Sequence, residues 1–385
     1  MRSLIQNLFP TQGGALGLEI GASNLKLVEL GGRHLQLRSF AMRPTPPDLF
    51  HEGMILEPNA LADEIRLLVE EAGAKKRRVI TALANQVAIT RIISVPRMER
   101  KELEEAIRWE AERYIPFPLE EVVLDFDLLD DPSELEEGEE MEVIIAAAKE
   151  EVVVQLAETL YAAGLNPVAI DLKPFAGLRT IEPFLSPQEN EAEENEVAPI
   201  TTYLEIGAES SSLVFLRGER PLLVRALRIA GNHFTQAIAK AFGLDLERAE
   251  HIKREYALAT LSTEDEAAMA EMEERTDGPS PAQIYDAIHP ILLDLTTEVR
   301  RSFDFFRSQF EEHHLHQAYL AGGGSKLKGL KGLLSDALGI TFVEINPWSQ
   351  IKIDESRFDL NHLHEVGPEF VVPVGLALRG VQRVG

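Results

Sequence analysis

Apolar and polar residues follow one another in the same way at the start of each half of the chain. Apolar runs at residues 15–21 and 24–30 predict two strands joined at Gly21-Ala22-Ser23, and runs at 201–206 and 211–217 predict a second such pair. The phrase Leu-Glu-Ile-Gly-Ala stands at residues 18–22 and again at 204–208. Two copies about half a chain apart indicate a duplicated architecture.

Further elements follow from the same pattern. Strands are predicted at 34–41, 79–83, 87–95, 122–129, 143–148, 168–171, 221–227, 317–321 and 340–345. Helices are predicted at 60–72 with Asn59 as the cap, and at 99–114, 150–163, 174–182, 231–242, 245–257, 282–311, 327–338 and 373–381. Pro290 is expected to kink or split the long helix at 282–311.

The order of these elements predicts the domain organisation. The block from residue 86 to 164 reads strand, helix, strand, strand, helix, which predicts a small α/β insert. The acidic stretch 186–195 predicts the junction between the halves, and the polar stretch 262–281 an excursion from the second half. We therefore expect a first domain formed by 1–85 and 165–190, the insert 86–164, and a second domain 196–385 with a subdomain at about 231–300.

Composition and charge narrow the class of partner. The chain has 385 residues, enough for two domains, and a formal net charge of -26, which disfavours binding to nucleic acid and to anionic lipid. It has no cysteine, so disulfides, zinc–thiolate sites and thiol nucleophiles are excluded. No apolar run reaches the roughly 18 residues of a membrane span, and residues 1–10 are too short for a signal peptide. We expect a cytoplasmic protein that reaches a membrane only through a partner.

The first hairpin has the residue types of a phosphate-binding turn. Gly21 and Ala22 let backbone N–H groups approach phosphate oxygens, and Ser23 and Asn24 add side-chain donors. Lys26 supplies a cation, and Glu19 at the strand end is a candidate ligand for hydrated Mg²⁺. An ordinary β-hairpin with a glycine turn is the alternative. The second hairpin repeats the arrangement, with a second candidate Mg²⁺ ligand in Glu205 and phosphate-binding candidates at Gly207, Ala208, Glu209 and Ser210.

A third glycine turn lies near the end of the chain. The predicted strand 317–321 leads into Gly322, Gly323, Gly324, Ser325 and Lys326, and a helical pattern follows. A strand that passes through a glycine turn into a helix N-terminus can seat a nucleotide. We therefore expect these five residues to contact the adenosine part of the ligand.

The three turns, in this order, resemble the two phosphate motifs and the adenosine motif of the superfamily of actins, chaperone ATPases and sugar kinases. Residues 249–254 resemble the helix that contacts the nucleoside in bacterial actin homologues, which assigns Glu250 and Lys253 to the ligand. Residues 371–377 resemble a connecting helix whose glycine permits close helix crossing. The resemblance implies bound ATP and Mg²⁺ on an α/β, ribonuclease H-like, duplicated two-domain actin-like fold.

A narrower resemblance rests on residues 101–118, which are similar to the insert of the type IV pilus assembly family PilM, as is the ending at 375–380. That family is related to the cell-division protein FtsA and shares its inserted subdomain. The resemblance implies an ATP-binding scaffold that captures the N-terminal cytoplasmic tail of the inner-membrane protein PilN in a groove between core and insert.

Glu19 and Glu205 stand where the superfamily usually has aspartate, and no general base for water attack is evident. We therefore expect nucleotide binding with slow or absent hydrolysis and assign no catalytic residue. Two alternatives stay open. One is an active ATPase or phosphotransferase of the same fold, and the other is an FtsA-type division protein, which the absence of an amphipathic helix at residues 378–385 disfavours.

Three smaller features have alternative readings. Leu103, Ile107 and Tyr114 are expected on the buried face of helix 99–114, whereas Trp109 lies off that face and packs on the main domain or meets a partner. Lys75 to Arg78 is expected in a solvated loop. His313, His314 and His316 are expected at a helix end in a structural role rather than as metal ligands, and His362 and His364 in a loop.

Overall fold

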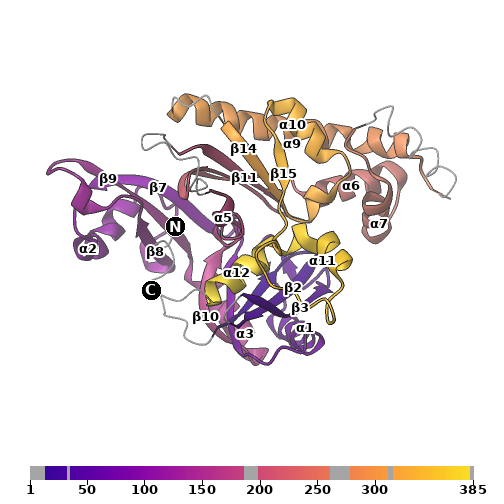
Figure 1. The fold of residues 1–385 in the computed structure, drawn as a ribbon, viewed down its shortest axis with the longest axis horizontal. Helices are drawn as coiled ribbons and strands as arrows, with labels where there is room; N and C mark the ends of the chain where they lie inside the picture. The colour runs from indigo at the N-terminus through magenta and orange to yellow at the C-terminus, as the bar shows by residue number, and fades with distance from the viewer. Residues whose placement is uncertain (1–13, 33–34, 186–197, 261–277, 311–314, 382–385) are drawn as a thin grey trace. The chain divides into compact units, whose positions relative to one another are not determined.

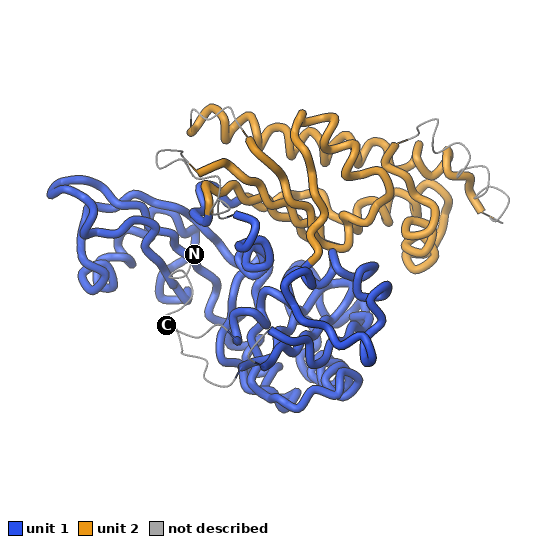
Figure 2. The backbone as a smooth tube through the Cα atoms, viewed as in Figure 1, with its two compact units in different colours: residues 1–186, 219–224, 347–385 blue, residues 187–218, 225–346 orange. Residues whose placement is uncertain are grey.

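The computed structural model describes residues 14–32, 35–185, 198–260, 278–310 and 315–381. The chain forms two compact units, residues 1–186, 219–224 and 347–385 in the first and 187–218 and 225–346 in the second (Figure 2). The predictions for residues 1–10, the junction at 186–195, most of the excursion at 262–281, and His313 and His314 lie outside the described residues.

The first unit is built on a five-stranded mixed sheet (Figure 1). Its strands, in spatial order, are β10 (Asn166–Leu172), β6 (Arg78–Leu83), β1 (Leu16–Ile20), β2 (Asn24–Gly31) and β3 (Gln36–Pro44). The central strand β1 pairs antiparallel with β2 and parallel with β6. All five residues of β1 are buried, as expected of a strand covered on both faces.

Helices cover both faces of this sheet. On one face, α1 (Pro58–Glu71) and α3 (Glu150–Ala162) share a core with β1 and β2 that includes Leu18, Leu61 and Leu156. On the other face lie α4 (Lys173–Leu178) and α12 (Val371–Val381), with Ala176 and Leu376 in the core. Short elements complete the unit: β4 (Phe50–His51), β5 (Met54–Ile55), α5 (Glu182–Leu185) and α11 (Leu360–Val366).

Residues 88–149 add a second, smaller sheet to the first unit. Its strands are β7 (Ala88–Pro96), β9 (Glu140–Lys149) and β8 (Val122–Leu128), in that spatial order, and α2 (Arg100–Ala111) packs on them. Their core contains Val95, Leu103, Ile107 and Ile145. Apolar residues at helical spacing on α2 thus meet alternating apolar residues on the strands, which explains why this segment packs as a layer of its own.

The second unit repeats the sheet of the first. Its spatial order is β13 (Arg220–Leu227), β12 (Ser211–Arg217), β11 (Ile200–Ile206), β14 (Leu315–Ala321) and β15 (Phe342–Glu344). As in the first unit, the central strand pairs antiparallel with the next strand and parallel with a later one. The helices are α6 (Gly231–Phe242), α7 (Leu246–Tyr256), α9 (Pro281–Phe310) and α10 (Leu330–Leu338). Phe306 of α9 stacks on Phe215 of β12, with ring centroids 4.3 Å apart.

Several local predictions are wrong. Helix α1 begins at Pro58 after Glu57, so Asn59 lies inside the helix and is not its cap. His362 and His364 lie in α11 rather than in a loop. Tyr114 follows the end of α2 and is 42% exposed, so the buried stripe is completed by Ala111 instead. Helix α9 continues through Pro290, so it is not split there.

Candidate functional site

The first glycine turn joins β1 to β2 and is tied to β3. Gly21 N–H donates to Asn24 O at 3.1 Å. Thr45 then fixes the turn twice, because its Oγ1 donates to Gly21 O at 2.7 Å and its N–H to Ser23 O at 2.9 Å. A Cβ on Gly21 would lie 2.8 Å from Asn24 O, so the turn requires glycine. Gly21, Ala22, Ser23 and Asn24 therefore form one rigid backbone loop.

Glu19 is held between two lysines beside this turn. Lys26 and Lys173 Nζ each donate to a different Glu19 carboxylate oxygen, both at 3.0 Å. Burial by itself raises the pKa of Glu19, but the two cations outweigh it and lower that pKa to about 2. The carboxylate is therefore ionised and fixed. Lys26 and Glu19, predicted separately for phosphate and magnesium, form an ion pair.

The second glycine turn joins β11 to β12 and supports the start of α6. Gly207 N–H donates to Ser210 O at 2.9 Å, while Gly207 O and Ala208 O accept from Gly231 N–H and Asn232 N–H, both at 2.8 Å. A Cβ on Gly231 would lie 3.1 Å from Gly207 O. The Gly207 turn and the first turn of α6 are thus in direct backbone contact. Glu205 is buried, and Ser212 Oγ donates to it at 3.4 Å.

Glu250 and Lys253 of α7 reach the same place. Lys253 Nζ donates to Gly231 O at 3.2 Å and to Thr235 Oγ1 at 2.9 Å, and it pairs with Glu250 at 2.5 Å. Burial opposes ionisation of Glu250, but Lys253, Thr235 and Arg254 outweigh it and lower the pKa of Glu250 to about 2. The pair is therefore a charged, oriented group next to the Gly207 turn.

The third glycine turn packs on the second. Gly322 has a φ of +87°, and a Cβ there would lie 2.3 Å from Ile206 O, the carbonyl that precedes Gly207. A Cβ on Gly324 would lie 2.3 Å from Ile206 Cγ2. Contrary to prediction, the turn does not enter a helix N-terminus: residues 323–326 form a 3₁₀ turn, and α10 begins at Leu330. Ser325 is buried, and its Oγ donates to Gly322 O.

The second unit thus brings together most of the predicted ligand-binding residues. The turn at Gly207–Ser210, the Glu250–Lys253 pair and the turn at Gly322–Lys326 lie around the start of α6 and the end of β11. Gly21–Asn24, Glu19 and Lys26 belong to the first unit. Within the described residues, no three or more His, Asp or Glu side chains are grouped to hold a metal ion.

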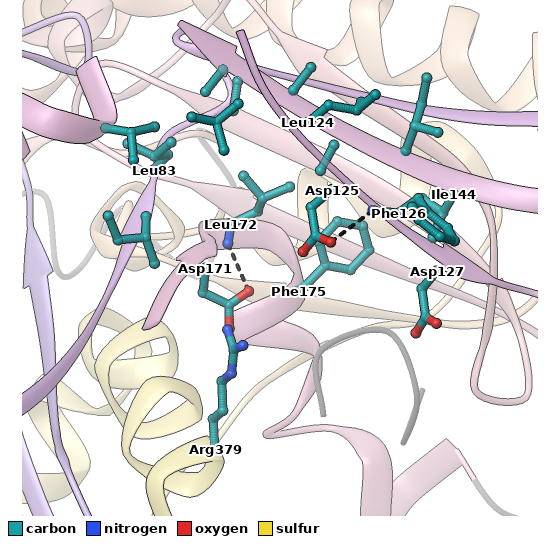
Figure 3. Close-up of a pocket in the computed structure, with 18 residues that line it drawn as sticks. Leu83, Leu124, Asp125, Phe126, Asp127, Ile144, Asp171, Leu172, Phe175 and Arg379 are labelled. Atoms are coloured by element: carbon teal, nitrogen blue, oxygen red, sulfur yellow. Dashed lines mark hydrogen bonds and ion pairs between the residues drawn. The ribbon is translucent and has the colours of Figure 1, made fainter. Parts of the chain in front are cut away.

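A separate cavity of about 210 Å³ lies in the first unit, between the small sheet and the main sheet (Figure 3). Its lining is mainly apolar and includes Leu83, Leu124, Ile144, Leu172 and Phe175. The strand β8 contributes the consecutive residues Val123–Asp127. Within the described residues β8 pairs with β9 on one side and with no strand on the other, so it is an edge strand.

One end of the cavity carries a buried ionic cluster. Arg179 and Arg379 Nη1 lie 2.7 and 3.0 Å from the same oxygen of Asp171, and Figure 3 shows Arg379 reaching from α12 toward it. Burial raises the pKa of Asp171, but the two guanidinium groups outweigh it and hold that pKa below its usual range. The cluster fixes the junction of β10, α4 and α12 beside the cavity.

Two further carboxylates line the cavity on β8. Burial raises the pKa of Asp125 above its ordinary value, and the nearby Asp127 adds to this effect. Asp127 is 1% exposed and accepts from Arg100 Nη1 at 2.7 Å through Oδ1, while its buried Oδ2 has no hydrogen-bond partner in the structure. The cavity is therefore apolar along its walls and acidic on β8, a combination suited to an apolar segment with a basic side chain.

Sequence reasoning did not identify the cavity residues, nor Lys173, Thr45 and Thr235. Lys173 follows the end of β10, an edge strand of the sheet, and a cation directly after a strand is a weak signal that was available. The pairing of Lys173 with Glu19 spans 154 positions and has no local signature.

Trp109 is 74% exposed on α2, so it does not pack on the main sheet. As predicted, Lys75 and Arg77 lie exposed in a loop, while Lys76 in the same loop donates to Leu30 O at 2.9 Å and Arg78 begins β6.

No helix in the described parts of the chain has the length and apolar character needed to cross a membrane.

Comparison with known proteins gives one family and several similar structures. The family model for type IV pilus assembly protein PilM matches residues 17–381. A chain of a PilM-PilN type IV pilus biogenesis complex is 50% identical, with 97% of this chain and all of that chain covered and a TM-score of 0.84. The ethanolamine utilization protein EutJ from Carboxydothermus hydrogenoformans is 14% identical, with 98% of this chain and 94% of that chain covered and a TM-score of 0.55. MreB5 of Spiroplasma citri bound to ADP is 11% identical, with 96% of each chain covered and a TM-score of 0.53. The predicted duplicated actin-like fold is thereby confirmed.

Proposed function

The chain belongs to the PilM family of type IV pilus assembly proteins, and from this premise we propose that it is an ATP-binding scaffold that binds the N-terminal cytoplasmic tail of PilN. The observation that carries the proposal is the cavity between the small sheet and the main sheet. Through PilN, the protein would act at the cytoplasmic face of the inner membrane. Residues 86–164 would then be the partner-binding insert.

The cavity suits an extended peptide for two reasons. The edge strand β8 offers backbone N–H and C=O groups that a peptide can pair with, as in β-strand addition. The apolar walls take alternate side chains, and Asp125 and Asp127 favour a Lys or Arg among them. Binding of a cationic side chain would compensate the charge of Asp125, which burial now disfavours.

Titration with a synthetic peptide of the PilN tail tests this proposal. Asp125→Lys reverses the charge within the cavity and is expected to weaken binding by roughly tenfold or more, about the cost of one buried like-charge contact. Glu158→Lys makes the same change on the exposed side of α3, outside the cavity, and is the matched control. Equal affinity for both variants and the unaltered chain would contradict the cavity as the binding site.

For ATP, we infer that phosphates contact the turns at Gly21–Asn24 and Gly207–Ser210, near Lys26 and Lys253. Three facts support this: glycine is required by each turn, a charged Glu–Lys pair lies next to each, and Gly322 packs on the end of β11. Glu19 and Glu205 would reach Mg²⁺ through water, and the bound Mg²⁺ would offset phosphate charge. Gly322–Lys326 would contact the adenosine part.

Hydrolysis is expected to be slow or absent. Glu19 is held by two lysines and Glu205 is buried beside Ser212, so neither is placed to accept a proton from water. Phosphate release measured at saturating Mg-ATP checks this. Steady turnover of about 1 per second or faster would instead indicate an active ATPase.

A further inference from the structure

Arg220 ties the loop between β12 and β13 to the small sheet. Its Nη1 donates to Leu129 O at 2.7 Å and to Asp130 Oδ1, and its Nη2 donates to Glu142 Oε2 at 2.5 Å. Asp130 Oδ2 also accepts from Glu142 N–H at 2.7 Å, so the two acids are bound to each other as well as to Arg220. Burial opposes the ionised forms, but the contacts lower the pKa of Asp130 and raise that of Arg220.

This cluster holds one end of the cavity wall. Leu129 and Asp130 directly follow β8, which lines the cavity with Val123–Asp127. Glu142 lies on β9, which lines it with residues 144–148. A bidentate guanidinium that joins both strands at the end where residues 129–139 connect them restricts their separation and twist there. Arg220 is therefore placed to set the shape of the cavity without entering it.

The other end of the same hairpin is bound to the second glycine turn. Strand β12 begins at Ser211, directly after Gly207–Ser210, and Ser211 Oγ donates to Ile229 O at 2.7 Å, two residues beyond the end of β13. From there Gly231 N–H reaches Gly207 O. Strand β12 has seven residues, a span of about 23 Å at 3.3 Å each. The hairpin thus runs as a paired, hydrogen-bonded element from the glycine turn to Arg220.

We propose that Arg220 couples the nucleotide turn at Gly207–Ser210 to the peptide cavity, so that bound ATP changes the affinity for the PilN tail. The inference rests on the proposed function and adds the structural path by which bound ATP would affect peptide binding. Ligand contact at the turn displaces the base of the hairpin, and a paired hairpin transmits that displacement to its tip. Strand β13 begins in the first unit and ends in the second, so one covalent element belongs to both.

The test measures the affinity for a fluorescent PilN-tail peptide with and without Mg-ATP. In the unaltered chain the two affinities are expected to differ by roughly fivefold or more, the lower range of allosteric couplings. Arg220→Gln is expected to bring the ratio to within about twofold, while the ATP-induced rise in Tm persists. Arg220→Lys keeps the charge without the bidentate geometry and is expected to fall between the two.

Two further variants separate coupling from general damage. Arg225→Gln removes an arginine of the same strand that lies over Phe305 rather than on the small sheet, and it is expected to keep the full ratio. The double variant Asp130→Asn with Glu142→Gln is expected to reproduce Arg220→Gln, with no added effect when all three changes are combined.

The outcomes distinguish this inference from the function it rests on. If peptide and ATP both bind but neither alters the affinity for the other, or if Arg220→Gln keeps the full ratio, the coupling is wrong and the scaffold function stands. If the unaltered chain binds no peptide, the proposed function fails and the coupling fails with it.

Discussion

At the scale of single residues, the two copies of the sequence Leu-Glu-Ile-Gly-Ala place a buried glutamate opposite different residues. Glu19 pairs in the sheet register with Lys26, and Glu205 pairs with Ser212 at the equivalent position of the second unit. Two lysines compensate the charge of Glu19, whereas a hydroxyl lies beside Glu205. Both halves of the repeat therefore surround a buried carboxylate with partners, because an ionised group out of water requires charge or hydrogen bonds around it.

Glu19→Gln is expected to destabilise the protein by on the order of 3 kcal/mol at pH 7, from the shift of its pKa from 4.5 to about 2. A pKa lowered by folding means that the stabilisation is full above pH 4.5 and is lost as the pH falls toward 2. The difference between variant and unaltered chain should therefore fall to about half near pH 3. Urea unfolding between pH 3 and pH 7 measures it, and a difference that does not depend on pH would contradict this account.

The two tryptophans offer a second residue-scale prediction. Trp348 is 4% exposed, packs against Phe40 and Phe370, and donates its indole N–H to Leu363 O at 2.8 Å. Trp348→Ala is expected to cost about 3–5 kcal/mol of the free energy of unfolding, whereas Trp109→Ala on exposed α2 should stay within about 0.5 kcal/mol. Denaturant unfolding of both variants checks the contrast. Similar losses would show that Trp109 is covered.

At the scale of elements, α12 sits closer to its neighbours than any side chain allows. A Cβ on Gly375 would lie 1.7 Å from Ala176 O of α4, and one on Gly17 of β1 would lie 2.2 Å from Pro373 O of α12. Gly375 allows α12 to approach α4, and Gly17 allows α12 to approach β1, which explains how the helix packs on strand and helix together. It also places Arg379 beside Asp171 at the cavity.

Gly375→Ala is expected to lower the free energy of unfolding by about 3 kcal/mol or more, because α12 must move away from Ala176. Gly332→Ala is the matched control, since nothing lies within 4 Å of its added Cβ in α10. There the same change should stabilise by up to about 1 kcal/mol, through helix propensity. Thermal melts of the two variants in opposite directions would bear this out, and equal melts would refute the close crossing.

At the scale of the whole molecule, the repeat assigns one phosphate turn to each unit. If both turns hold one triphosphate, Lys26→Glu in the first unit and Lys253→Glu in the second should each weaken ATP binding. At an ATP concentration about 100 times the Kd, binding stabilises by about 2.7 kcal/mol, which raises Tm measurably.

Both variants should lose most of that ATP-induced rise in Tm, and Lys331→Glu on α10, where Lys331 pairs with Glu344 of β15, should keep it. Loss in only one of the two variants would mean that the turns do not share a ligand.

Much of the fold could be predicted from the sequence, because the patterns that specify its strands and helices are local. The strands around Glu19 and Glu205 and the helices at α3 and α6 follow from alternation and helical spacing within about a dozen residues. The wrong predictions also have local causes. Asn59 is a good cap by type, but Pro58 at the first helical position sets the helix start two residues earlier than predicted. Gly322–Gly324 pack on Ile206, a contact that no residue nearby in the sequence indicates.

The sequence by itself determined the duplicated order of strands, the glycine turns and the absence of thiol chemistry, because periodicity and residue type act within short segments. Only the tertiary structure decided which charges meet: Glu19 with Lys173, Asp171 with Arg379, and Arg220 with Asp130 and Glu142. All four of these pairs join residues that lie 78 or more positions apart in the sequence, so no local pattern indicates them. A carboxylate out of water is stable only where packing brings a cation or hydrogen-bond donors to it, and packing is a property of the whole fold.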